Sequence, residues 1–141
     1  MGNSESTVAL PARKRPLSVW LLALLNGLLA ILLIATYFKG DDWGIPAGQS
    51  TFWGLLGLGI SLAAHTMWFG SRIGRNLLLA LITVYFALLL AQNLRDIAWA
   101  SDYNGSENYI LIEGARALFG LVWLFVNYWY LLGGRARSFF A

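Results

Sequence analysis

The sequence predicts an all-α membrane protein in which four transmembrane helices form an antiparallel bundle. The prediction rests on four long apolar stretches, on the charge distribution between them, and on a composition of 58% hydrophobic and 12% charged residues over 141 positions. A soluble domain carries about twice that share of charged residues. Helices that are apolar on every face cannot be stable in water, which makes a soluble helical core the unfavourable alternative.

The four apolar stretches define the expected spans, about 17–38, 52–70, 77–97 and 109–132. At a rise of 1.5 Å per residue, about 20 residues cross a hydrocarbon core of about 30 Å. We therefore expect a transmembrane domain over 17–134. A disordered, basic cytoplasmic segment over 1–16 should precede it, and a basic, aromatic cytoplasmic tail over 135–141 should follow it.

Charge alternates between the connections. Seven of the ten Lys and Arg residues lie before the first span, between the second and third, and after the fourth. Six of the seven acidic residues lie in or beside the other two connections. The positive-inside rule then predicts that both termini are cytoplasmic, N-in and C-in. The net charge of +3 would attract anionic lipid of the inner leaflet.

Several function classes are unfavourable on the residues present. The sequence contains no cysteine, which excludes thiol catalysis, disulfide exchange and zinc–thiolate sites. It has no Ser-His-Asp order, no pair of aspartates within the spans and no HExxH motif. No basic patch interleaved with aromatic residues lies outside the spans, so no nucleic-acid partner is expected. We expect a non-enzymatic protein without a catalytic residue, cofactor or metal.

Two spans carry stripes of small residues at helical spacing. They are Gly54, Gly57, Ser61 and Ala64 in the second span, and Ala23, Asn26, Gly27 and Ala30 in the first. Small residues let helix backbones approach closely in lipid. The stripes predict packing faces inside the bundle, with a dimerisation face as the alternative.

Four polar residues lie at a similar depth, within about 7–14 Å of the inner interface. They are Asn26, His65, Thr83 and Asn127. Hydrocarbon penalises unpaired polar groups, so we expect these side chains to face one another as a polar clamp that sets helix register. The alternative is a proton or ligand site centred on His65, because histidine changes charge near neutral pH. Haem ligation by His65 would require a partner chain.

A second polar cluster is expected near the outer face. It consists of Gln92 and Asp96 near the end of the third span and of Glu113 and Arg116 near the start of the fourth. Arg116 lies about 10 Å inside the boundary, where an unpaired charge is costly. We expect an ion pair with Glu113, Asp96 or both. The pair could hold the two helices together, or the cluster could be a site for a substrate or partner.

Two segments carry a resemblance to a known group. They are the residues from Trp68 to Leu78 (WFGSRIGRNLL) and those from Tyr130 to Phe140 (YLLGGRARSFF). Both are similar to segments of small bacterial four-span inner-membrane proteins of uncharacterised function. The resemblance implies a topology class and a bacterial inner-membrane location, without an assigned activity. In the tail, Arg135 and Arg137 should contact lipid phosphates while Phe139 and Phe140 lie in the interface.

We therefore predict an accessory or assembly subunit of a larger membrane complex. Its partners would be membrane lipids and other membrane subunits or a second copy. The fourth span supports this prediction with an uneven aromatic surface of Phe119, Trp123, Phe125, Tyr128, Trp129 and Tyr130. The alternative is a small-solute or lipid-handling transporter that uses the outer cluster. Small four-span multidrug exporters carry an embedded Glu in the first span, whereas this first span contains no acid.

Overall fold

A computed structural model describes residues 16–42, 44–102 and 107–140 of the chain. All regular structure in these ranges is helical. The helices are α1 (Leu17–Lys39), α2 (Ala47–Trp68), α3 (Arg72–Asp102), α4 (Glu107–Leu132) and α5 (Gly134–Phe139). The segment predicted to be disordered, 1–16, lies outside the described residues except for Pro16.

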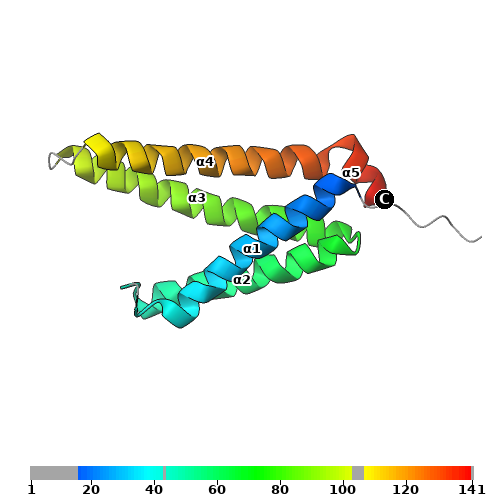
Figure 1. Ribbon diagram of the computed structural model, residues 1–141, viewed down its shortest axis with the longest axis horizontal. Helices are drawn as coiled ribbons and strands as arrows, with labels where there is room; N and C mark the ends of the chain where they lie inside the picture. The colour runs from blue at the N-terminus through cyan, green and yellow to red at the C-terminus, as the bar shows by residue number, and fades with distance from the viewer. Residues whose placement is uncertain (1–15, 43, 103–106, 141) are drawn as a thin grey trace, which may run out of the picture.

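The four long helices form two pairs that meet at one end of the molecule and diverge toward the other (Figure 1). α1 packs beside α2, and α3 packs beside α4. The start of α1, the turn between α2 and α3, and α5 lie together at what we call the closed end. The connection between α1 and α2 and the far ends of α3 and α4 lie apart at the open end.

Three helices, not four, are long and apolar enough to cross a membrane by length and composition. They are Leu17–Lys39, Arg72–Trp99 and Tyr109–Leu132. The expected span over 52–70 is helical as α2 but is not among these three. Its leucines are interrupted by glycines and by the polar residues Ser61, His65 and Thr66, which lower its mean hydropathy.

α3 begins earlier than the apolar stretch indicates, at Arg72 instead of residue 77. The hydroxyl of Ser71 accepts a hydrogen bond from the backbone N–H of Gly74 at 3.1 Å. This is the N-cap interaction that satisfies one of the first free N–H groups of a helix. Gly74 also packs against the backbone of α2, because a Cβ there would lie 2.6 Å from the backbone nitrogen of Met67.

Small residues bring α1 and α2 into close contact. A Cβ on Gly57 would lie 2.8 Å from the carbonyl oxygen of Ala30, and one on Gly54 would lie 2.7 Å from Cβ of Tyr37. These glycines therefore serve as the packing face that the sequence predicts. Two members of the predicted stripes do not: Ser61 is exposed, and a Cβ on Gly27 would meet nothing within 4 Å.

The C-terminal segment differs most from its predicted place. Instead of lying in the membrane interface, Phe140 is 2% exposed and belongs to the core. The Arg75 guanidinium carbon lies 5.1 Å from the centroid of its ring, a cation–π contact, and Nε of Arg72 donates a hydrogen bond to its carbonyl oxygen. The first turn of α3 thus holds the C-terminal segment against the core.

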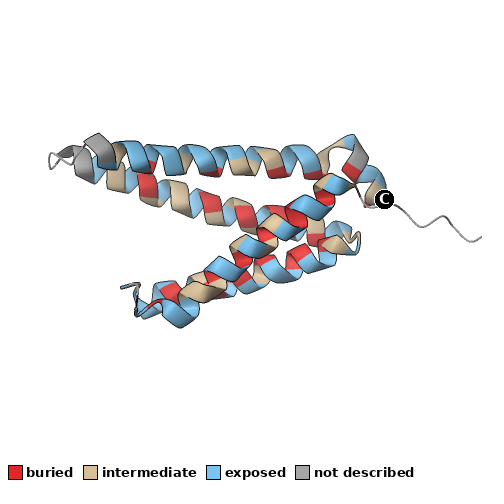
Figure 2. Ribbon diagram, in the orientation of Figure 1, coloured by how far each residue is buried: buried red, intermediate tan, exposed pale blue. Residues whose placement is uncertain are grey.

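Burial is uneven along the molecule (Figure 2). Buried residues recur on the facing sides of α1, α2 and α3, whereas α4 is mostly exposed. Within the most apolar part of each span, 33% of residues are buried in α1 and 28% in α3, against 11% in α4. α4 therefore has the least contact with the rest of the chain among these three helices.

Candidate functional site

The four residues of the predicted outer cluster line one cavity on the α3–α4 pair. The cavity has a volume of about 810 Å³ and opens to the surface. Gln92 and Asp96 reach it from α3, and Glu113 and Arg116 reach it from α4. α3 and α4 therefore bring these four side chains to the lining of a common cavity.

Glu113 lies at the centre of the cluster and is 4% exposed. Nη1 of Arg116 donates to its Oε1 at 2.5 Å, one helical turn away, so the expected pairing of these two residues is confirmed. One end of the Asn93 side-chain amide faces only acceptors and the other faces only donors, which sets its orientation. With the nitrogen toward the acceptors, Nδ2 donates to Oε2 of Glu113 at 3.2 Å and to the carbonyl oxygen of Leu89 at 3.2 Å.

Asn93 was not among the predicted site residues. It is 3% exposed and extends the apolar stripe of Ile82, Phe86 and Leu89 at helical spacing. A polar residue in line with buried apolar positions was the signal that could have identified it. Through Asn93, α3 contributes directly to holding the carboxylate of Glu113.

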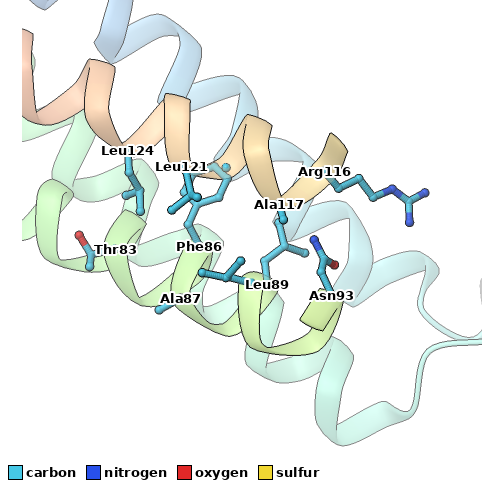
Figure 3. A pocket seen from close by; sticks show the side chains of 11 residues that line it. Thr83, Phe86, Ala87, Leu89, Asn93, Arg116, Ala117, Leu121 and Leu124 are labelled. Atoms are coloured by element: carbon cyan, nitrogen blue, oxygen red, sulfur yellow. The ribbon is translucent and has the colours of Figure 1, made fainter. Parts of the chain in front are cut away.

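Asp96, the second expected partner of Arg116, forms its ion pair elsewhere. Asp96 pairs with the adjacent Arg95, with Oδ1 and Nε 3.6 Å apart. The Arg116 side chain is 63% exposed and extends from α4 away from the seam (Figure 3). Because Glu113 and Arg116 are one turn apart on a single helix, they can pair without any contribution from Asp96.

A second, smaller cavity of about 140 Å³ lies on the same seam. Figure 3 shows its lining, with Phe86 and Leu89 on α3 opposite Ala117 and Leu121 on α4. A Cβ on Gly120 would lie 2.9 Å from Cδ1 of Phe86, so the glycine makes room for that ring. The cavity offers apolar surface almost throughout.

Two members of the predicted inner clamp meet. Nδ2 of Asn26 donates to Oδ1 of Asn127 at 2.7 Å and to the carbonyl oxygen of Leu22 at 2.8 Å. Nε1 of Trp123 donates to Oδ1 of Asn26 at 3.3 Å, and Nδ2 of Asn127 donates to the carbonyl oxygen of Trp123 at 3.0 Å. Both asparagines are fully buried. This network joins α1 to α4.

The other two members lie elsewhere. Thr83 bonds to the carbonyl oxygen of Leu79 at 2.7 Å and to the hydroxyl of Tyr128 at 2.9 Å, so it joins α3 to α4. His65 is exposed, and its ring meets that of Phe69 edge-on at 5.0 Å. One residue of helix rotates a side chain by about 100°, so His65 leaves the interface that Ala64 occupies. The predicted clamp is therefore wrong at His65, whereas Thr83 makes the expected bond between helices but to Tyr128 and not to the asparagines.

The two polar clusters differ in how many of their hydrogen-bonding groups already have partners. The carboxylate of Glu113 has partners on both oxygens, whereas Nε and Nη2 of Arg116 make no bond to another described residue. The described residues include no group of three His, Cys, Asp or Glu able to hold a metal ion.

Among known proteins, no family model, curated sequence or solved structure matches the chain.

Proposed function

We propose that this chain is a non-enzymatic integral membrane protein that acts as an accessory or assembly subunit of a larger membrane complex. In this proposal all four long helices cross a bacterial inner membrane as an antiparallel bundle, with both termini cytoplasmic. The 22 residues of α2 and its close packing along α1 support its place as the fourth span. The basic residues at the closed end support the orientation.

The single observation that carries the subunit proposal is the exposed aromatic face of α4. Phe125 stacks on Trp129 with ring centroids 5.6 Å apart. Phe125 and Trp129 are 63% and 66% exposed. Aromatic residues are enriched at protein interfaces, where they supply large contact area at little conformational cost. We propose that a transmembrane helix of another subunit packs on this face.

Site-specific photo-crosslinking in intact membranes tests the proposal. A photoreactive amino acid at Phe125 should give one discrete crosslinked protein product. Leu62, which is 66% exposed on α2, is the matched control and should react mainly with lipid. Equal crosslinking from both positions, or lipid adducts alone at Phe125, would remove the support for a subunit interface on α4.

The orientation has its own test. Reporter fusions after Ser71 and at the C-terminus should be active only in their cytoplasmic form, and a fusion after Gly44 only in its external form. An external C-terminus would contradict the N-in, C-in arrangement and the four-span count together.

A second candidate function is lipid or small-solute handling, and the cavity of about 810 Å³ with its charged lining favours it. Pockets for small ligands have volumes of about 300–1,000 Å³. If the protein moves lipid between leaflets, liposomes that contain it should translocate a fluorescent phospholipid faster than empty ones. The Glu113→Gln/Arg116→Met variant should lose that gain. Equal rates in protein-containing and empty liposomes would exclude this candidate.

A further inference from the structure

The lining of the large cavity changes from polar to apolar along the helices. Asp96, Gln92 and Arg116 lie toward the open end, whereas Phe86 and Phe119 lie deeper. The ten helical steps from Phe86 to Asp96 span about 15 Å, which is about half the thickness of a hydrocarbon core. The cavity therefore has the length and the polarity of one leaflet.

We propose that this cavity binds one aminophospholipid, with the headgroup at Arg116 and Asp96 and an acyl chain along Phe86 and Phe119. The inference rests on the proposed membrane-spanning arrangement, and it specifies the ligand class of the second candidate function. It requires binding only, and no translocation.

The deep part of the cavity provides an apolar surface for the acyl chain. Leu29 of α1, Phe86 and Leu89 of α3, and Phe119 of α4 contribute to the deep part of the cavity. These side chains come from both helix pairs, so a chain placed there would contact both pairs. Lipid hydrocarbon fills such a gap without leaving a polar group unpaired.

Arg116 supplies the phosphate contact. A guanidinium has five N–H donors in a planar fork that matches phosphate oxygens. Nη1 donates to Glu113, while Nε and Nη2 have no partner among the described residues. Glu113 thereby positions the guanidinium and leaves part of the fork for a ligand.

The charges around the cavity determine which lipid headgroup it prefers. The lining contains two carboxylates, and each has a guanidinium partner, Arg95 for Asp96 and Arg116 for Glu113. A lipid with a net negative charge would leave one negative charge without a counter-charge at this site. A zwitterionic lipid instead places its ammonium near Asp96, whose side chain is 28% exposed and lies 3.6 Å from Arg95. A primary ammonium can donate hydrogen bonds to Asp96 and Gln92, and a quaternary one cannot.

Native mass spectrometry of the full chain ejected from lipid nanodiscs tests the proposal. The nanodiscs contain equal amounts of dioleoyl phosphatidylethanolamine, phosphatidylcholine and phosphatidylglycerol. We expect one retained lipid, with phosphatidylethanolamine favoured roughly tenfold over the others, as one charged hydrogen bond predicts. Preferred retention of phosphatidylglycerol, or equal retention of all three, would overturn the headgroup assignment.

Variants separate the two headgroup contacts. Asp96→Asn should reduce the preference for phosphatidylethanolamine over phosphatidylcholine, and Glu113→Gln/Arg116→Met should abolish retention of every lipid. Asp42→Asn is the matched control, because Asp42 is exposed and paired with Lys39 at 3.1 Å. It should behave as the unaltered protein does. Loss of preference in this control, or an unchanged preference in Asp96→Asn, would overturn the role of Asp96.

Two further outcomes are distinguishable. Glycerophosphoethanolamine, which has the headgroup without acyl chains, should not displace the retained lipid, and displacement would overturn the acyl-chain contact. Protein that inserts into nanodiscs but retains no lipid would overturn this inference alone. Protein that fails to insert at all would overturn the proposed membrane function as well.

Discussion

The closed and open ends of the molecule contain similar polar side chains but use them differently. At the closed end, Asn26 and Asn127 are fully buried, and their amides bond to each other and to Trp123. Toward the open end, Glu113 is equally enclosed, but its partner Arg116 is 63% exposed beside a cavity. The asparagine network forms its hydrogen bonds internally, whereas the Glu113–Arg116 pair keeps hydrogen-bond donors at a surface.

The difference shows that a buried polar group in a membrane helix need not indicate a ligand site. Where every donor and acceptor has a partner and no cavity adjoins, the network can only set the register of the helices. A binding site requires an additional feature, namely a donor or acceptor that faces accessible space. By this criterion the cluster around Arg116 is the candidate site, and the asparagine network is not.

The largest effect is expected at the closed end, where Phe140 anchors the C-terminal segment. Phe140→Ala should lower the free energy of unfolding by about 3 kcal/mol, because it removes a buried ring and leaves a cavity. Unfolding in mixed micelles, followed by tryptophan fluorescence, measures this change. Phe69→Ala is the control, since Phe69 lies at the same end but is 67% exposed. Equal loss in both variants would contradict a specific anchoring role for Phe140.

The asparagine network should have the next largest effect. Asn26→Ala should cost about 2 kcal/mol of unfolding free energy, because it removes the bonds to Asn127 and Trp123 and leaves a small cavity. A double-mutant cycle with Asn127→Ala should give a coupling energy of about 0.6–1.7 kcal/mol. Asn76→Ala, at an exposed asparagine of α3, should change little. Strict additivity of the two buried positions would show that their bond contributes nothing.

A smaller effect is expected at Arg116. Arg116→Ala should cost about 1 kcal/mol of unfolding free energy, because Glu113 keeps only Asn93 as a partner; the exposure of the guanidinium reduces its own contribution. Arg116→Lys should recover part of the loss, since it keeps the charge without the planar fork. Glu113→Gln/Arg116→Met should restore stability.

The same variants also test whether the cluster around Arg116 binds a ligand. If the cluster is a binding site, the Glu113→Gln/Arg116→Met protein should fold normally yet fail to retain lipid. Full lipid retention in this stable double variant would show that the pair serves only to hold the helix.

The smallest effect is expected at His65. His65→Leu should change the free energy of unfolding by less than about 0.5 kcal/mol, because the side chain is exposed and takes no part in the asparagine network. The same mixed-micelle unfolding measures it. A loss of unfolding free energy as large as that of Asn26→Ala would show that His65 takes part in the asparagine network.

The helices and their order were predictable from local patterns in the chain. The four apolar stretches appear as helices α1 to α4, and three of these are long and apolar enough to cross a membrane, because hydropathy and helix length are local properties of the chain. The Glu113–Arg116 pair was also predictable, since both residues lie on one helix, one turn apart.

Which polar residues meet depends on how the helices pack against one another. Depth along a helix can be counted from the sequence, but the direction of each side chain around the axis depends on how neighbouring helices pack. A step of one residue rotates a side chain by about 100°. That step exposes His65 beside the buried Ala64, and it places Asn93, rather than Gln92, against Glu113. The divergence of the two helix pairs and the burial of Phe140 likewise depend on contacts between segments far apart in the sequence, which no local pattern records.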